Sequence, residues 1–163
     1  MTAWHTRTPE EVADLATRLR AIDWTWQITE IDQVAQRFGW KVISSKPAWA
    51  LLDTGLGPAS GKAFADNGQV ERLQVDASTI GPDTSEGRTE VHAAYSAMTR
   101  TLVATLGPPT TEIIGDLEEL RWAGPHSTLL LQELARSIKL SLVTNEWLTG
   151  FDHRVELSRQ GQL

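Results

Sequence analysis

The sequence predicts an α+β fold: a mainly antiparallel sheet with a long central helix packed on one face and two helices at the N-terminus. The first observation is a long helical pattern over 85–107, with apolar positions every three or four residues: Val91, Ala94, Met98, Leu102 and Leu106. The second is a series of short strand-like runs on both sides of that helix, separated by turn residues. The chain has 163 residues and neither a repeat nor a linker, so we expect a single domain over 1–163.

Two helices are predicted before the first strand. Thr8 and Glu11 form a capping box, with proline at the first helical position, and an apolar face continues to Ile22. Alternation over 24–28 then predicts a short extended segment. The second helix is predicted over 29–39, where Thr29 supplies the cap and Gly39 the stop.

The remaining elements are strands and one final helix. Strand patterns cover 40–44, 49–53, 61–65, 69–76, 113–114, 119–123, 128–134 and 137–144. Asp66-Asn67-Gly68 supplies a hairpin turn between two of them, and broken alternation near Arg72 predicts a bulge. Short turns between the last four strands predict an antiparallel meander. Asn145 is the predicted cap of a closing helix over 146–159.

Composition excludes several classes of function. The formal net charge of −6 argues against a nucleic-acid ligand, because nucleic-acid binders present a basic surface, but it suits a basic protein partner. No apolar run approaches the roughly 18 residues of a membrane span, so we expect no membrane partner. The N-terminus lacks an apolar signal core, which predicts a cytoplasmic protein. Cysteine is absent, which excludes disulfides and thiolate metal sites. The seven tryptophans predict core packing, with the alternative that one or two of them anchor a protein interface.

One segment invites comparison with a phosphate-binding loop. Gly55 to Lys62 is rich in glycine, but Leu56 occupies the place of the first loop glycine and Ala63 that of the magnesium-binding hydroxyl. The turn at 66–68 also leaves no room for the helix whose N-terminus would bind phosphate. We therefore expect a strand connection here and no nucleotide cofactor.

No set of residues predicts catalysis or metal binding. The histidines have no metal-ligand spacing, and no serine lies in a nucleophile elbow: His5, His92, His126 and His153. Carboxylates cluster at Glu10-Glu11 and at Asp116, Glu118 and Glu119, next to helix starts or loops, where capping and solvated roles are commonest. The sequence therefore predicts that the protein is not an enzyme.

Several segments resemble a family of small uncharacterised actinobacterial proteins: LATRLRAIDWTW, FGWKVISSKPAWALLDTGLG, NGQVERLQVDAST, ATLGPPT and LSLVTNEWL. The likeness runs from about Glu11 to Leu148, and its motifs are structural. The chain is also similar in size and style to immunity proteins of secreted polymorphic toxins, such as the immunity factor of the tuberculosis necrotizing toxin, which destroys NAD. No site residue can be transferred from that factor.

The resemblance implies a cytoplasmic immunity protein that binds and inhibits a secreted toxin domain, with NAD-degrading toxins as one class of partner. The alternative is a chaperone-like module for a secreted effector, and an enzyme with a dispersed site is a third reading. Contacts are expected in loops, because loops vary without disturbing the fold. The predicted partner-binding residues are the hairpin tip with a nearby lysine, and an acidic turn: Asp66, Asn67 and Lys62, and Asp116, Glu118 and Glu119.

Overall fold

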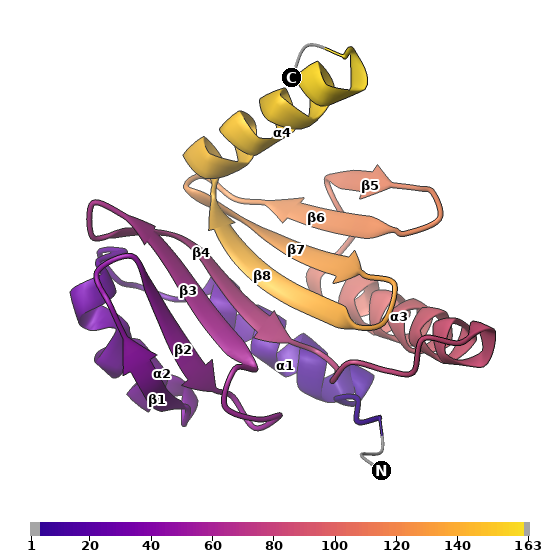
Figure 1. The fold of residues 1–163 in the computed structure, drawn as a ribbon, viewed down its shortest axis with the longest axis horizontal. Coiled ribbons are helices and arrows are strands. Elements are labelled where there is room, and N and C mark those ends of the chain that lie inside the picture. The colour runs from indigo at the N-terminus through magenta and orange to yellow at the C-terminus, as the bar shows by residue number, and fades with distance from the viewer. Residues whose placement is uncertain (1–3, 162–163) are drawn as a thin grey trace.

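The computed structural model describes residues 4–161 and contains one eight-stranded antiparallel sheet (Figure 1). The strands are β1 (Lys41–Ser45), β2 (Trp49–Asp53), β3 (Gly61–Asp66), β4 (Gln69–Asp76), β5 (Thr111–Ile113), β6 (Glu119–Ala123), β7 (Ser127–Glu133) and β8 (Ile138–Thr144). The helices are α1 (Pro9–Arg20), the 3-10 helix η1 (Ile28–Glu30), α2 (Ile31–Phe38), α3 (Ser85–Leu106) and α4 (Asn145–Arg159). The α+β class and the antiparallel sheet predicted from the sequence are confirmed.

The sheet joins two four-stranded meanders. The strand order is β1-β2-β3-β4-β8-β7-β6-β5, so consecutive strands pair everywhere except at the central β4–β8 junction. That junction pairs five residues of each strand, from Arg72 opposite Val143 to Asp76 opposite Lys139. Helix α3 connects the two meanders behind the sheet (Figure 1).

The core lies between the sheet and the helices α1, α2 and α3, which cover one of its faces (Figure 1). The predicted stripe of α3 supplies buried side chains, with Tyr95 among them: Val91, Tyr95, Met98 and Leu102 are each at most 1% exposed. Helix α1 contacts α3 and the strands β7 and β8, so the two longest helices of this layer pack side by side. The long helix packed on one face of the sheet is confirmed.

The opposite face of the sheet carries polar side chains and is partly covered by α4. Leu148 of α4 packs on Leu130 and Val143. Arg121 in β6 donates two hydrogen bonds of 2.7 and 3.0 Å to the carboxylate of Asp152 in α4. Hydrogen bonding to Asp152 raises the pKa of Arg121, although its burial acts in the other direction. These contacts hold the first half of α4 over one end of this face.

The segment before α2 differs from the prediction. The alternation over 24–28 predicts an extended run, but Trp26, which is buried, interrupts it with a φ of 61°. Gln27 forms a bridge with Gln69, and η1 follows. The cap predicted at Thr29 is therefore wrong, because α2 begins after Glu30, which makes no side-chain cap bond. Gly39 ends α2 with a φ of 73°, as predicted.

The hairpin between β3 and β4 agrees with the sequence. Asn67 and Gly68 both have positive φ and form the two-residue turn between Asp66 and Gln69, the geometry that matches the twist of the strands. Glu71 is the extra residue of a bulge, because Phe64 pairs with Arg72 and Ala65 with Val70. The predicted bulge next to Arg72 is confirmed.

Candidate functional site

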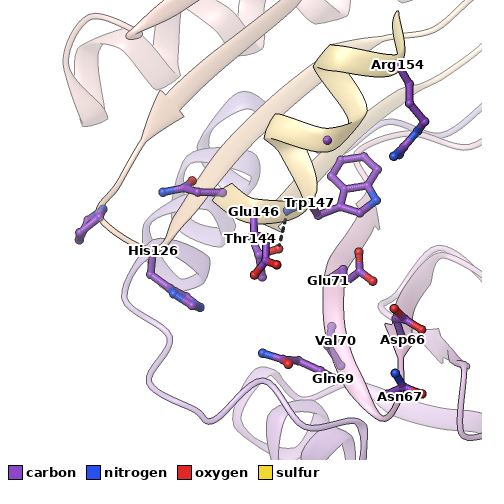
Figure 2. Close-up of a pocket in the computed structure, with 13 residues that line it drawn as sticks. Asp66, Asn67, Gln69, Val70, Glu71, His126, Thr144, Glu146, Trp147 and Arg154 are labelled. Carbon is purple, nitrogen blue, oxygen red and sulfur yellow. Dashed lines mark hydrogen bonds between the residues drawn. The ribbon is translucent and has the colours of Figure 1, made fainter.

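A cleft of about 520 Å³ lies between the tip of the β3–β4 hairpin, the β6–β7 turn and α4. We call it the hairpin–helix cleft. Figure 2 shows hairpin residues on one side, the first turns of α4 on the other, and His126 of the β6–β7 turn at the end away from Asp66. The lining residues are Asp66, Asn67, Gln69, Val70, Glu71, Pro125, His126, Thr144, Asn145, Glu146, Trp147, Gly150 and Arg154.

The hairpin side of the cleft is positioned by the turn and the bulge. The turn places Asp66 and Asn67 at the tip, and both side chains are exposed. The bulge adds Glu71 to β4 beyond the regular pairing, so its carboxylate joins the cleft from the same hairpin. The backbone of Val70 donates a 2.7 Å hydrogen bond to the carbonyl of Trp26, which anchors the hairpin to the segment before η1.

The helix side is positioned by the junction of β8 and α4. The Thr144 hydroxyl caps α4 by accepting a hydrogen bond from the backbone of Trp147 (Figure 2). The cap predicted at Asn145 is therefore wrong. The amide of Asn145 instead donates to the Gly124 carbonyl at 2.8 Å and accepts from the Thr128 hydroxyl at 2.6 Å. Asn145 thereby ties the start of α4 to the β6–β7 turn.

Contacts with neighbouring side chains hold the ring of Trp147 in place. The Arg72 guanidinium lies 4.1 Å from the Phe64 ring centroid and 4.8 Å from that of Trp147. The ring of Trp147 also stacks with that of Phe151, at a centroid separation of 5.0 Å. Burial lowers the pKa of Arg72, and the charge of Glu71 opposes that change. The indole is therefore a held, half-buried wall of the cleft.

The charges around the cleft are unbalanced. Carboxylates enter it from three segments, at Asp66, Glu71 and Glu146, and the lining also contains the guanidinium of Arg154. Figure 2 shows Arg154 extending toward Trp147. These three carboxylates and one guanidinium give the lining a net negative charge, which favours a cationic group on whatever enters. A carboxylate-rich cleft with an aromatic wall suits a lysine or arginine side chain.

Two of the predicted contact residues, Asp66 and Asn67, lie in this cleft, but the third of that group does not. Lys62 is at the start of β3, four residues before Asp66 and roughly 13 Å away along an extended strand. It pairs opposite Leu51 and Gln74 on the polar face of the sheet. Lys62 and the hairpin tip, which the sequence grouped together, therefore do not form a single surface.

The predicted acidic turn is also divided. Glu119 accepts hydrogen bonds from Arg121 at 2.5 Å and from Gln132 at 2.6 Å, so its charge is already paired within the protein. Glu118 uses its backbone N–H to donate to the side chain of Glu133 at 3.2 Å. Asp116 is exposed. Only part of this acidic turn is thus free to meet a partner.

Asp116 lines a second hollow, of about 580 Å³, between α3 and the β5–β6 loop. Glu133 lies at its base with a side chain 5% exposed, and its carboxylate is 2.8 Å from Nδ1 of His92. This pair joins α3 to β7. The two predicted groups of contact residues therefore lie at separate places on the molecule.

Sequence reasoning did not identify most of the cleft. Glu71, His126, Glu146, Trp147 and Arg154 come from three segments whose approach depends on strand pairing. The spacing of Trp147 and Phe151 was visible as a helical face, but it predicts burial, whereas Phe151 is 37% exposed. No local signal placed these residues beside Asp66.

Within residues 4–161, no three His, Asp or Glu side chains are grouped closely enough to hold a metal ion. The described helices include none with the length and apolar character needed to cross a bilayer. The glycine-rich segment before Lys62 leads directly into β3, as predicted, so no helix follows it in the chain. The cleft thus offers charge, hydrogen bonds and an aromatic surface.

Comparison with known proteins identifies a family. A model of a family of unknown function, DUF6301, matches residues 10–144, which include every element from α1 to β8 apart from the first residue of α1. No curated protein and no solved structure matches the chain.

Proposed function

This chain belongs to the DUF6301 family of unknown function, and we propose that it is a non-catalytic protein-binding module. Because the family's function is unknown, the proposal rests on the surface of the chain itself. Most concretely, it is a cytoplasmic immunity protein that binds and inhibits a secreted toxin domain. The choice of a toxin as the partner rests on the resemblance of the sequence to toxin immunity proteins. NAD-degrading enzymes are one class of such toxins. The observation that carries the binding role is the hairpin–helix cleft with its acidic lining and aromatic wall.

The chemistry of the cleft supports a basic segment of the partner as the contact. Asp66 and Glu146 are exposed and lie on opposite walls, so a lysine or arginine between them would meet carboxylates from two sides. The ring of Trp147 would add a cation–π contact. Because the lining is net negative, it would also accelerate encounter with a basic partner at low ionic strength.

The first test is co-expression with the neighbouring open reading frame of the native genome. We expect that frame to be toxic alone, and this protein to restore growth and to co-purify with its product. For an NAD-degrading partner, cellular NAD should be preserved as well. A toxic neighbour that is neither neutralised nor bound would end the immunity proposal. A neighbour that encodes secretion machinery without a toxin domain would favour the chaperone-like alternative.

The second step locates the interface on the complex. Asp66→Lys combined with Glu146→Lys should slow association about ten-fold or more at low salt, with a smaller effect at high salt. Glu86→Lys combined with Glu90→Lys is the matched control, because both residues are exposed on α3 and the change in net charge is the same. Equal slowing by the control would mean that overall charge, and not the cleft, drives association. A separate variant, Asp116→Lys, tests the remaining exposed carboxylate of the acidic turn.

A further inference from the structure

We propose that the partner also inserts an aromatic side chain into a small pocket on the far side of the β6–β7 turn, next to the basic side chain held in the cleft. This inference rests on the proposed binding function and extends it to a recognised pair of residues. The pocket has a volume of about 230 Å³. We call it the tryptophan pocket, after Trp26 and Trp122 in its walls.

The floor of the tryptophan pocket is the core of the protein. Leu129 of β7 and Leu142 of β8 line it, and each is at most 1% exposed. Trp122 is held by a 3.0 Å hydrogen bond from its indole Nε1 to the carbonyl of Gly107. The lining combines these apolar side chains with the polar groups of Arg20, His126 and Ser127. Ligand sites for whole small molecules usually occupy about 300–1,000 Å³, so this pocket suits one side chain better than a complete ligand.

The wall formed by Trp26 is held at an energetic cost. Its φ of 61° is a left-handed conformation that a bulky residue seldom adopts, and such strain is of order 1–3 kcal/mol. Trp24 packs on it with its ring tilted, at a centroid separation of 5.2 Å, and buries an indole N–H without a hydrogen-bond partner among residues 4–161. Strained and unsatisfied groups concentrate at functional sites, so both features support a binding role for this segment.

The tryptophan pocket and the hairpin–helix cleft are neighbours. Pro125 and His126 line both of them, so the β6–β7 turn is their common border. Residues of an extended segment follow one another at about 3.3 Å. We therefore expect an extended segment that crosses this turn to bring a basic side chain to the cleft and a nearby side chain to the pocket, and the two test peptides below compare adjacent with next-but-one spacing.

The rim favours an aromatic occupant over an aliphatic one. Arg20 and His126 border the pocket, and both are exposed. A guanidinium beside an inserted ring would contribute a cation–π contact, whereas it gains nothing comparable from an aliphatic group. Trp26 and His126 already meet edge to face at 5.6 Å, an arrangement that a further ring can extend.

The test uses synthetic peptides as probes of the intact protein. The two test peptides are Gly-Gly-Arg-Phe-Gly-Gly and Gly-Gly-Arg-Gly-Phe-Gly, with blocked ends. Control peptides replace either the arginine or the phenylalanine by glycine. Indole N–H signals in ¹⁵N-labelled protein report on each site separately, because Trp26 and Trp122 line the pocket and Trp147 lines the cleft.

We expect phenylalanine-containing peptides to shift the Trp26 and Trp122 signals, and arginine-containing ones to shift Trp147. At least one peptide with both residues should bind about ten-fold or more tightly than the peptide that lacks phenylalanine, the gain expected for burying an aromatic side chain. Ser127→Phe, which places a ring inside the pocket from β7, should abolish that gain, whereas Ser127→Ala leaves the pocket open and should keep it.

The inference is overturned if phenylalanine leaves the Trp26 and Trp122 signals unchanged, or if the gain survives in Ser127→Phe with an unchanged thermal midpoint. If Ser127→Phe fails to fold, the wild-type indole shifts and affinities decide alone. The two proposals fail separately: Trp147 shifts with arginine alone would keep the cleft and reject the pocket. Pocket shifts without any response of Trp147 would reject the basic contact in the cleft.

Discussion

The guanidinium of Arg72 lies over two aromatic rings, those of Phe64 in β3 and Trp147 in α4. Its Nε atom is buried without a hydrogen-bond partner in the described protein, so the two ring contacts, and not a bond to Nε, hold this part of the side chain. Planar stacking is a property of arginine that the compact ammonium of lysine does not share. This one residue therefore connects the hairpin wall of the cleft to the helix wall.

Replacing Arg72 by lysine should lower the free energy of unfolding by about 1 kcal/mol, because a partly desolvated cation–π stack is lost while the charge is kept. Urea denaturation followed by circular dichroism measures this change. Arg88→Lys is the control, because Arg88 is exposed and makes only a long surface ion pair of 3.9 Å with Asp83. This change should alter the free energy of unfolding by less than about 0.5 kcal/mol. Equal effects of both changes would contradict the stacking argument.

At the scale of the element, α3 is the helix on which the core depends. Thr84 caps it by accepting a hydrogen bond from the backbone of Gly87 at 3.0 Å, and Gly107 ends it with a φ of 89°. Its buried stripe faces the sheet, while its other side reaches solvent at positions such as Ala93. The same helix also borders the hollow that contains His92 and Glu133.

Met98→Asp or Leu102→Asp should prevent stable folding, because each would bury an unpaired carboxylate at a position at most 1% exposed. Ala93→Asp introduces the same group on the exposed side of α3. Its cost should be close to the difference in helix propensity, about 0.7 kcal/mol. Thermal unfolding of the three variants checks this, and wild-type stability of Leu102→Asp would disprove the packing described for α3.

At the scale of the whole molecule, the two meanders are joined by strands and by helices. The β4–β8 pairing includes an ion pair of 2.7 Å between Lys139 and Asp76 on the polar face. Behind the sheet, α1 from the first half contacts α3, β7 and β8 from the second half. Neither half can separate without exposing core residues of the other.

We therefore predict that residues 1–163 unfold as one cooperative unit. Tryptophan fluorescence and far-UV circular dichroism should give coincident urea transitions, the usual test of two-state behaviour. Leu140→Ala, at the β4–β8 junction, should shift both transitions together by about 2–5 kcal/mol, since the residue is fully buried. Two separate transitions, or a shift in one probe alone, would mean that the halves are independent domains.

The sequence by itself determined the local elements of this protein. The capping box at Thr8 and Glu11, the Asn67-Gly68 turn and the Gly39 stop all depend on interactions within a few residues of the chain. The stripe of α3 and the bulge near Arg72 were likewise visible as breaks or periods in hydrophobicity. Such features are predictable because their energies are set by neighbouring residues.

The tertiary structure decided the features that join distant segments. Asn145 is a good helix cap by type, but its amide is used by Gly124 and Thr128, and the cap passes to Thr144. The hairpin tip meets α4 because β4 pairs with β8, a choice among strands that alternation alone does not encode. Pairing between strands far apart in the chain depends on the packing of the whole sheet, and this is why the cleft had no signature in the sequence.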